Sequence, residues 1–547
     1  MKIPPLSILQ QILKARGIES GQFEQIFHPD FERDTHNPLL LKGMPEALAR
    51  ISKALNTAEN IVIFGDYDAD GVPATALLVR GLEELGGMVT PLIPLRSEGY
   101  GLGEEAIRRI LATECTLLIT VDNGTVAKAE IAQLRKAGVE TIVIDHHQPV
   151  LEHIATDSLA IINPKQPGCE YPFKELCGCA LAWKLLWALY EHQGHDPKQL
   201  KWLLDLVALS TVADMVPLRG ENRVLVQFGL QVLHKTRNQG LQALVAVSDS
   251  NLAEVGAGEI GFRLAPRLNA PSRVHKDTYQ GKHPSLSLLL ATEADEAQEL
   301  AVYLNTCNAE RQSILETQLA EAVLEAEKYS EDRCLVVYRP EWSSGVIGLL
   351  AGRLVEMYKR PVIVLAQEEG QIKGSVRSVE GVDTVELLQS AEELLERYGG
   401  HAKAGGMTLK SEVGDFRAKV QEFIQNFTLE DLAAQTRRKP DLTLPLELAD
   451  LDLAEELETL EPFGIGFPAP IFTTECTIVA PRLVGKQQNH LSCFLEEAGV
   501  RRKAIAFNYR GDPVREGARV AVNYKLDVEE YREVRAASCC IEDLTVL

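Results

Sequence analysis

The chain has 547 residues, which suggests three or four domains rather than one. Hydrophobic residues make up 45% and charged residues 24%, so a largely disordered chain and a fibrous repeat protein are both excluded. The formal net charge of −22 excludes a protein that coats nucleic acid by bulk charge, and any contact with a polyanion must come from local basic patches.

The first half of the chain predicts a helical segment at 1–54 and an α/β domain at 55–225. In this domain short apolar runs alternate with helical patterns, which indicates a parallel sheet with crossover helices. We expect its strands at 61–65, 91–95, 117–121, 141–144 and 159–162. We expect helices at 74–86, 126–137, 179–193 and 198–212.

A helical connector at 226–330 is expected next. Its last part, 294–329, contains no Gly or Pro and predicts one helix of about 54 Å, long enough to bridge two domains. A second α/β domain is expected at 331–430. Its expected strands are 334–338 and 362–366, and its expected helices are 346–357 and 384–396. The stretch 433–441 reads as a linker.

The last segment, 443–547, has short β-rich runs separated by Gly, Asn and Pro, which is typical of a small β-barrel. Residues 471–547 carry 11 Lys/Arg and 11 Asp/Glu, so all of the net negative charge lies before them. Eight of these basic residues are arginines. Two interpretations fit: an ordinary charged surface, or a patch that follows a nucleic-acid strand.

No apolar stretch reaches the roughly 18 residues that span a bilayer, and the N-terminus does not read as a signal peptide. Ten scattered cysteines, without a CxxC pair, argue against a zinc ribbon and a disulfide framework. We therefore expect a cytoplasmic protein that makes no membrane contact.

Acidic and histidine side chains follow several of the predicted elements. Three aspartates fall within GDYDADG (65–71), directly after the first strand, and VDNG and DHH end two later strands. The carboxyl ends of parallel strands meet at one edge of a sheet, where open α/β folds bind ligands. A single Asp is more often a turn or cap residue, but so many from separate elements indicate a metal site. The candidate ligands are Asp66, Asp68, Asp70, Asp122, Asp145, His146, His147 and Asp214.

Carboxylates mixed with imidazoles favour Mn²⁺ or Mg²⁺ over Zn²⁺ or Fe²⁺. The number of ligands is sufficient for two ions about 3.5–4 Å apart, an arrangement that supports in-line phosphoryl displacement by a hydroxide. The sequence therefore predicts a metal site that could hold two ions and support phosphoryl displacement.

GDYDADG, VDNG, DHH and VADMVPL, in this order and at these intervals, resemble the motifs of the DHH phosphoesterases. Later blocks, such as GVIG (345–348), GSVRS (374–378), GGHAKAG (399–405) and EPFGIG (461–466), resemble the RecJ group of bacterial single-strand exonucleases within that family. The resemblance runs from about residue 37 to the C-terminus. It implies an α/β fold: a DHH parallel-sheet domain and a DHH-associated α/β domain, joined by the long helix and followed by an OB-fold barrel.

The resemblance also implies residue roles. The family's metal-binding and catalytic positions match Asp68, Asp70, Asp122, His146, His147 and Asp214, with Asp122 as the bridge, while Asp66 and Asp145 would support them. His401 would donate a hydrogen bond to the scissile phosphate. The proposed phosphate contacts are Arg96, Arg273, Ser375, Arg377, Gly399 and Gly400, with Arg96 and Arg273 at a terminal 5′-phosphate.

The implied activity is the 5′ to 3′ degradation of single-stranded DNA to 5′-mononucleotides, in DNA repair and recombination. A single-strand-binding protein and a helicase are the expected partners, and a monomer the expected state. Three alternatives remain: a phosphodiesterase of short substrates, a non-catalytic replication scaffold and an inorganic pyrophosphatase. The barrel segment counts against the first alternative, the complete ligand set against the second, and the chain length against the third.

Several positions depart from the family pattern. Phe64 stands where many members have a histidine, so one metal would have fewer protein ligands. Ser343 and Phe467 stand where His and Asn are common. Asn305, Asn308 and Gln312 form one polar stripe on the long helix, which either faces the cleft between the domains or is solvated.

Overall fold

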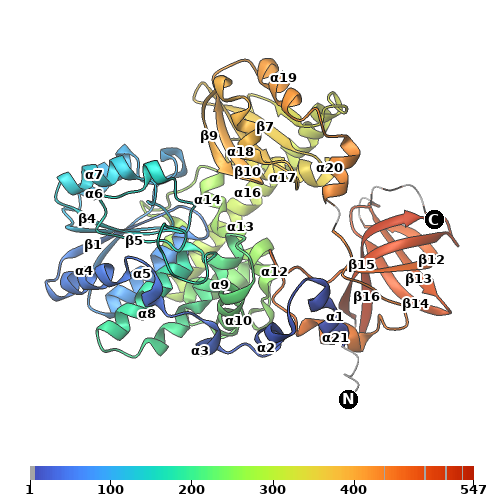
Figure 1. Cartoon of the computed structure of the whole chain (residues 1–547), viewed down its shortest axis with the longest axis horizontal. Helices are drawn as coiled ribbons and strands as arrows, with labels where there is room; N and C mark the ends of the chain where they lie inside the picture. Colours follow the sequence, from blue (N-terminus) through green and yellow to red (C-terminus); the bar gives the residue numbers. More distant parts are fainter. Residues whose placement is uncertain (1–6, 437, 486–487, 510, 512–513, 532–533) are drawn as a thin grey trace.

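The computed structural model describes residues 7–436, 438–485, 488–509, 511, 514–531 and 534–547. The start of the expected N-terminal segment and Arg437 of the expected linker lie outside these residues. Three lobes are visible: a large lobe from the first half of the chain, a smaller α/β lobe beside it, and a C-terminal barrel (Figure 1). Helices α1 (Ile8–Ala15), α2 (Phe23–Phe27), α3 (Phe31–Asp34) and α4 (Met44–Asn56) precede the first strand.

The first sheet is parallel, in the order β2-β1-β3-β4-β5. Its strands are β1 (Asn60–Gly65), β2 (Met88–Leu92), β3 (Leu117–Val121), β4 (Glu140–Ile144) and β5 (Ala160–Ile162). Four predicted strands are confirmed, but the strand expected at 91–95 was wrong, because β2 begins and ends three residues earlier. β2 is an edge strand, where Pro91 is tolerated although it has no N–H to donate.

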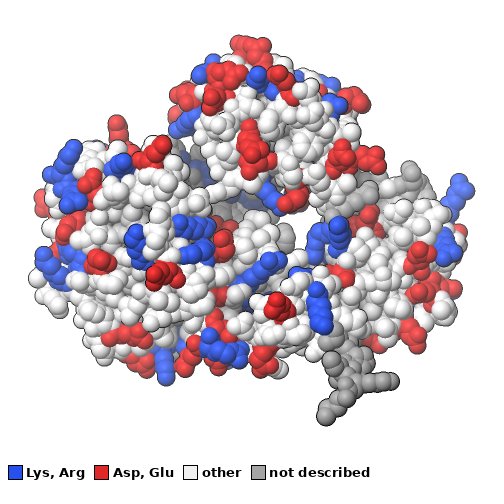
Figure 2. All heavy atoms as spheres, viewed as in Figure 1, with Lys and Arg blue, Asp and Glu red and all other residues white. Residues whose placement is uncertain are grey.

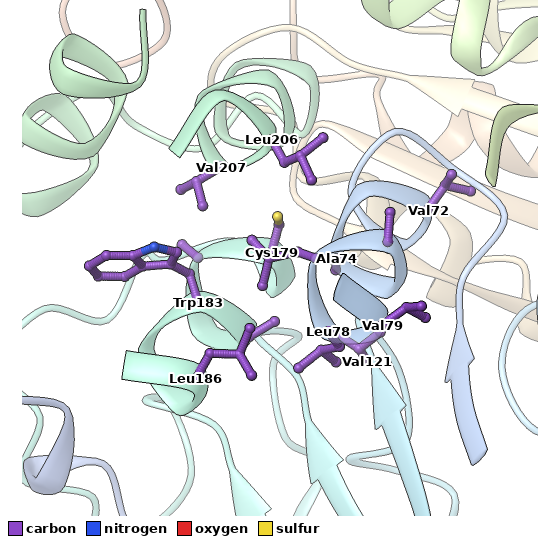
Figure 3. Close-up of a cluster of buried hydrophobic side chains, with 14 of the residues drawn as sticks. Val72, Ala74, Leu78, Val79, Val121, Cys179, Trp183, Leu186, Leu206 and Val207 are labelled. Carbon is purple, nitrogen blue, oxygen red and sulfur yellow. The ribbon is translucent and has the colours of Figure 1, made fainter. Parts of the chain in front are cut away.

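Both faces of this sheet are buried, as the apolar strands predict. Leu118 packs with Leu134 of α7 (Lys128–Lys136) and with α6 (Glu104–Leu111), whereas Ile119 belongs to the large core on the other face. Figure 3 shows how that core is built from Leu78, Trp183 and Val207 on three different helices. These helices are α5 (Gly71–Glu84), α8 (Gly178–His192) and α9 (Leu204–Ala213), followed by α10 (Gly220–Leu233). The helix expected at 198–212 was wrong in part, because 197–203 form 3₁₀ turns before α9.

The connector ends in the predicted long helix, α16 (Ala294–Glu327), whose 34 residues extend about 51 Å. Leu300 and Leu304 near its start belong to the core of the large lobe, and Ala322 and Ala326 near its end belong to the core of the second lobe. The helix therefore joins the two lobes as a shared element. The connector helices before it are α11 (Gln239–Val247), α12 (Ala257–Glu259), a π-helical turn (Ile260–Leu264), α13 (Ala265–Leu268), α14 (Ala270–Arg273) and α15 (Pro284–Leu290).

The second lobe has a mixed sheet in the order β6-β7-β8-β10-β9. Its strands are β6 (Leu335–Tyr338), β7 (Val362–Glu368), β8 (Gln371–Arg377), β9 (Leu395–His401) and β10 (Ala404–Leu409), and its helices are α17 (Ile347–Tyr358), α18 (Thr384–Gln389), α19 (Val413–Phe423) and α20 (Leu429–Thr436). The helix expected at 384–396 was wrong beyond Gln389, because residues 395–401 pair with β10. The linker expected at 433–441 was also wrong at its start, which is part of α20.

The C-terminal lobe is a closed five-stranded barrel. Its strands are β12 (Phe472–Val484), β13 (His490–Glu497), β14 (Val500–Ala506), β15 (Arg519–Tyr531) and β16 (Val534–Val546), and the pairing of β12 with β15 closes it. The short strand β11 (Leu442–Thr443) and helix α21 (Leu451–Glu458) precede them.

The segment leading into the barrel is held against the large lobe. Buried Arg223 of α10 donates hydrogen bonds to the carbonyl oxygens of Leu460, Glu461 and Pro462, and its guanidinium lies 4.3 Å from the ring centroid of Phe467. The segment that leads into the barrel is therefore fixed to the large lobe and is not a free linker.

Candidate metal centre

The predicted ligands meet at the carboxyl edge of the parallel sheet. The loop 66–70 follows β1, Asp122 follows β3, and His146 and His147 follow β4. Asp214 reaches the same place from the C-terminal end of α9. Elements far apart in the sequence thus bring their side chains to one cluster because parallel strands all end at this edge.

Asp122 lies at the centre of the cluster. Its backbone has φ +62°, a left-handed conformation that Asp adopts more readily than most residues, and its N–H donates to the carbonyl of Ile144. Its Oδ1 lies 3.2 Å from Nε2 of His146 and 3.8 Å from Nδ1 of His147. The turn therefore places this carboxylate between the two histidines and the acidic loop.

Asp70 is held by the N-terminus of α8. The N–H groups of Gly178 and Cys179 donate to its two carboxylate oxygens over 2.6 and 2.9 Å. A Cβ at Gly178 would lie only 2.9 Å from both Asp70 Oδ2 and the Cβ of Asp122. A glycine at this position is thus required for the close approach of α8 to the cluster.

Three sets of side chains have ligand atoms close enough to share a cation. They are Asp122, His146 and His147; Asp70, His146 and Asp214; and Asp66, Asp68 and Asp122. The buried atoms Asp66 Oδ1, Asp122 Oδ1, His146 Nε2 and Asp214 Oδ2 have no hydrogen-bond partner among the described residues. Buried polar atoms without partners are rare, so this donor set fits hard divalent ions.

The pKa values of the acidic groups show how much the cluster needs positive charge. Burial and then the neighbouring Asp68 raise the pKa of Asp70 to about 6. Burial and the charges of Asp70 and Asp68 raise the pKa of Asp122 and of Asp214 well above the usual value. Without cations, these carboxylates resist ionisation.

Stability of the metal-free protein is expected to fall as the pH rises. Because the folded state holds the proton of Asp70 more tightly than the unfolded chain does, its stabilising contribution is present below about pH 4 and is lost as the pH passes about 6. The loss from Asp70 alone is on the order of 3 kcal/mol. Urea unfolding of chelator-treated protein between pH 4.5 and 7.5 measures this loss of stability. Added Mn²⁺ should abolish the dependence of the unfolding free energy on pH. A flat profile for the metal-free protein would contradict the expectation.

Asp145 orients the two histidines through hydrogen bonds. It accepts hydrogen bonds from the N–H groups of Thr125, His146 and His147, and from Nδ1 of His147 over 2.8 Å. Burial opposes ionisation, but the hydrogen bond and charge of His147 outweigh it and hold the pKa of Asp145 below its usual value. Asp145 thus has the expected supporting position. Asp66 differs, because its carboxylate lies close enough to those of Asp68 and Asp122 to share a cation with them.

Two adjoining cavities extend from this cluster. One of about 380 Å³ contains the acidic loop, and one of about 670 Å³ lies between the large lobe and the second lobe. Tyr67, Arg96 and Arg273 line both. Of the predicted phosphate contacts on the second lobe, Ser375, Arg377 and Gly399 line the larger cavity.

The second lobe faces the candidate metal ligands. The ring of His401 stacks near that of His147, with centroids 6.4 Å apart and planes 20° apart. Gly400 lines neither cavity, and a Cβ there would lie 2.3 Å from the carbonyl oxygen of Ala404, so this glycine permits the close pairing of β9 with β10.

The arginines of the cavities are held by neutral groups. Arg273 donates to the carbonyl of Gly345, Arg377 donates to Ser375 Oγ, and the guanidinium of Arg96 lies 5.3 Å from the ring centroid of Tyr67. Burial, and then the charges of Arg96 and Arg311, lower the pKa of Arg273 to about 9. A bound anion would relieve this repulsion.

Some site residues were missed by sequence reasoning. The hydroxyl of Tyr100 donates to the carbonyl of Asp122 and lies 3.1 Å from Nδ1 of His147. Lys165 is close enough to lower the pKa of His146, Asp214 and His401 by its charge. Tyr100 lies four residues after Arg96, a predicted phosphate contact, but Lys165 carries no signal of its own in the sequence.

The departures from the family pattern have structural explanations. Phe64 is buried in the core on the α6/α7 face of the sheet, away from the ligands. The carbonyl of Ser343 accepts from the N–H of Val346 just before α17, and Phe467 packs beneath Arg223. Neither residue disturbs the ligand cluster.

The three residues of the polar stripe on α16 have different surroundings. Asn305 and Asn308 hold the guanidinium groups of Arg267 and Arg311, whereas Gln312 is exposed. The stripe is therefore neither simply solvated nor a direct lining of the two cavities.

Comparison with known proteins agrees with the three lobes. Family models match at residues 60–211 (DHH family, N-terminal domain), 331–426 (DHHA1 domain) and 440–543 (RecJ OB domain). The single-stranded-DNA-specific exonuclease RecJ of Bacillus subtilis is 35% identical over 556 residues, which cover 100% of this chain and 68% of that protein. The chain belongs to the RecJ family. This membership confirms the expected fold of DHH domain, DHH-associated domain and OB-fold barrel.

Two solved RecJ structures from Thermus thermophilus show the same arrangement. The complex with Mn²⁺ superimposes with a TM-score of 0.82 at 33% identity and covers 100% of this chain and 78% of that one. The complex with Mg²⁺ has a TM-score of 0.77 at 31% identity, with 100% and 77% coverage. Among the described residues of this RecJ-family chain, no helix is long and apolar enough to cross a membrane.

Proposed function

We propose that this chain is a metal-dependent exonuclease that degrades single-stranded DNA from the 5′ end to 5′-mononucleotides. The observation that carries the proposal is the position of Asp122, which is shared by two candidate ligand sets and lies beside His147, whose ring His401 faces, next to a cavity lined by arginines. Such a site combines ion binding with phosphate binding, as phosphodiester hydrolysis requires. The RecJ relatives carry this name, and the two Thermus structures contain Mn²⁺ or Mg²⁺.

The residues that would hold the ions are Asp68, Asp70, Asp122, His146, His147 and Asp214. When bound, Mn²⁺ or Mg²⁺ supplies Lewis acidity and a water of lowered pKa. Burial lowers the pKa of His401, so its ring is neutral near pH 7 and its N–H can donate to a phosphate oxygen. Asp145 keeps the ring of His147 in place during the reaction.

Polarity would follow from the arginines. Arg96 and Arg273 lie where the two cavities adjoin, with Ser375 and Arg377 on the facing lobe, and guanidinium groups match phosphate oxygens. A terminal 5′-phosphate held there would present the first phosphodiester to the metal ligands. A duplex would not fit the cleft, and equally fast digestion of a blunt duplex would contradict this view.

Removal of one of these arginines is expected to weaken recognition of the terminal phosphate. For Arg96→Ala or Arg377→Ala, kcat/KM on a 5′-phosphorylated strand should fall by about 10- to 100-fold, the loss of one charge-assisted contact. The same strand with a 5′-hydroxyl should be affected less than about threefold. Arg135→Ala, on the surface of α7, is the control. Equal losses on both strands would contradict a 5′-phosphate role.

The function itself is tested with one oligonucleotide labelled at either end, incubated with Mn²⁺ or with EDTA. Immediate release of the 5′ label as mononucleotide, only with metal, supports the proposal. An intact long strand with cleaved dinucleotides would favour a phosphodiesterase of short substrates. Binding without cleavage of either substrate would favour a scaffold.

We also propose the finer features that the sequence suggests. These are action in DNA repair and recombination beside a single-strand-binding protein and a helicase, a monomeric state, and a cytoplasmic location that suits ten free cysteines. The proposed domain boundaries remain 1–54, 55–225, 226–330, 331–430 and 443–547.

A further inference from the structure

A third cavity lies where the N-terminal helices meet α10 and the segment 460–468 that leads into the barrel. It has a volume of about 430 Å³ and shares no lining residue with the two cavities of the metal centre. Figure 1 shows α1 beside the barrel, and Leu13 of α1 belongs to the same buried core as Leu460. We call this space the junction cavity, and nothing in the proposed reaction accounts for it.

Arginine side chains gather around the junction cavity. The four that line it are Arg16, Arg33, Arg219 and Arg223. Two are neutralised, Arg16 by Asp441 and Arg33 by Asp34. The other two form no ion pair within the described part of the chain. Lys and Arg side chains also border the boundary between the large lobe and the barrel on the molecular surface (Figure 2).

The two carboxylates of the junction cavity are already bound. Asp34 accepts a hydrogen bond from Arg33, and Glu221 is paired with Lys184 and accepts from the hydroxyl of Tyr171. The unbalanced charge at the cavity is therefore positive, although the chain carries 22 more acidic than basic residues. Such a cavity favours an anion.

Arg223 keeps one hydrogen-bond donor unused. Its terminal nitrogens donate to the carbonyl oxygens of residues 460–462, but its buried Nε has no partner among the described residues. Burial, and then the charge of Arg16, lower the pKa of Arg223 to about 10. A buried charged donor without an acceptor is unfavourable, and an anion bound in the cavity would supply the acceptor and offset the repulsion from Arg16.

The N-terminus of α10 belongs to the same cavity. Gly220 and Glu221, the first two residues of this 14-residue helix, line it, and their N–H groups have no acceptor in the described part of the chain. The first N–H groups of a helix carry partial positive charge and commonly bind phosphate. Together with Nε of Arg223, two independent kinds of unused donor are present in one cavity.

The remaining wall of the junction cavity is apolar. Its residues are Ile18, Ile26, Leu218, Val224 and Phe467. The guanidinium groups of Arg16 and Arg223 lie 5.2 and 4.3 Å from the ring centroid of Phe467. Sites for small molecules typically combine an apolar wall with a few polar groups, in cavities from about 300 Å³ upward. The junction cavity has both parts, and its apolar wall suits a flat ring.

We propose that the junction cavity binds a 5′-mononucleotide, with the phosphate at the N-terminus of α10 beside Arg219 and Arg223 and the base against the apolar wall. Guanidinium groups match phosphate oxygens, and the helix terminus adds donors without any further side chain. Mononucleotides are the products of the proposed function, so the ligand's role as a product rests on that function, whereas the binding site does not.

The arginines of this site also fix the segment that leads into the barrel. Arg16 donates to the carbonyl of Pro468 and Arg219 to that of Gly466, besides the three carbonyls held by Arg223. A nucleotide that binds these arginines in the docked arrangement strengthens the attachment of the barrel to the large lobe. Accumulating product would thus restrict movement of the barrel.

Binding is measured by calorimetric titration of the full chain with dAMP, deoxyadenosine or inorganic phosphate, in EDTA. We expect dAMP to bind at least about tenfold more tightly than either of the other two, because it alone uses both the cationic groups and the apolar wall. Arg219→Ala should weaken dAMP binding by about 10- to 100-fold, the loss of one charged donor. Arg237→Ala, a surface arginine beside Trp202, is the matched control.

A second variant changes the charge and removes no contact. Gln22 is exposed and lines the junction cavity, and Gln22→Glu keeps the oxygen that accepts from the N–H of Glu19. Its added charge should weaken dAMP binding about two- to fivefold, as expected for an exposed charge. Gln199→Glu, at an exposed position outside the cavity, should change nothing. Unaltered dAMP binding in both Arg219→Ala and Gln22→Glu would overturn the site.

Hydrogen exchange locates the bound nucleotide. With dAMP at ten times its Kd, exchange in residues 460–468 should slow about tenfold, because the ligand binds only the docked segment. The slowing should persist in Arg96→Ala, since Arg96 lines only the cavities of the metal centre. Protection that is lost in this variant would place the nucleotide in the catalytic cavity and reject the proposal.

The remaining outcomes separate the parts of the proposal. Inorganic phosphate that binds as tightly as dAMP would reject the nucleotide, and deoxyadenosine that binds as tightly would reject the anion site. Wild-type protein that digests a strand with Mn²⁺, yet shows no protection of 460–468 by dAMP, rejects the junction site alone. Protection by dAMP without strand digestion rejects the proposed function and leaves the site in place.

Discussion

Asp122→Asn is expected to lower the Mn²⁺-dependent rate of strand digestion by at least about 10³-fold, equivalent to about 4 kcal/mol of transition-state stabilisation. Asp122 belongs to two of the three candidate ligand sets, so one substitution removes a ligand from both. Asn has nearly the same size and also tolerates the left-handed backbone at φ +62°, so the turn should persist. Single-turnover digestion of a labelled strand measures the loss.

A second readout identifies the cause of that loss. Because burial and neighbouring carboxylates raise the pKa of Asp122, replacing it with a neutral amide should raise the melting temperature of the metal-free protein at pH 8. The stabilisation gained on adding Mn²⁺ should shrink in the same variant. Asp157→Asn, at an exposed ion pair with Arg135, is the control and should change neither quantity. A rate within tenfold of the wild type would show that Asp122 is not a shared ligand.

Arg223→Ala is expected to release the segment that leads into the barrel. Arg223 is 4% exposed, and its loss leaves three carbonyl oxygens without their donor and removes the contact with Phe467. Hydrogen bonds from a charged donor contribute about 1.5–3 kcal/mol each, so docking should lose about 3 kcal/mol or more. Hydrogen exchange of residues 461–467 should accelerate by two orders of magnitude or more.

The control for this variant is Arg237→Ala, whose guanidinium lies 4.0 Å from the ring centroid of half-exposed Trp202. This surface contact should contribute less than about 1 kcal/mol. Unchanged exchange in the 461–467 segment of Arg223→Ala would mean that the barrel is held elsewhere. Retained dinucleotide hydrolysis in the same protein would confirm that the metal ligands remain folded.

The first lobe was predictable because its strands are continuous apolar runs buried on both faces, and because β1, β3 and β4 are each followed directly by polar ligands. The error at β2 came from reading the apolar run around Ile93 as strand. Ile93 is buried, but it lies beyond the last residue paired with β1. Burial alone does not reveal where the hydrogen-bonded ladder ends.

The second lobe was less predictable because its strands are rich in glycine, which is depleted from strands in general. A Cβ at Gly374 would meet the side chains of Leu365 and Met407, and Gly400 faces Gly405 across the β9–β10 pair. The helix predicted at 384–396 was overridden at its end, because residues 395–401 pair with β10. These glycines serve contacts between strands, which a local pattern does not contain.

The candidate site was also predictable only in part. Motifs indicated the candidate ligands, but not the approach of Gly178 to Asp70, which depends on how α8 packs against the sheet. Asp66 was predicted to support the ligands, and its carboxylate lies with those of Asp68 and Asp122 in one candidate ion-binding set, an arrangement that depends on the conformation of the loop.

The division of the site between two lobes has a consequence for synthesis of the protein. His401 follows Leu304, the last residue of the large-lobe core, by 97 residues, so at about 5–20 residues per second the ribosome takes roughly 5–20 s to add the facing lobe. The large lobe has its own core and ligands and can fold in that interval. We expect a nascent chain that holds cations but lacks the facing lobe, and so does not digest DNA until translation is nearly finished.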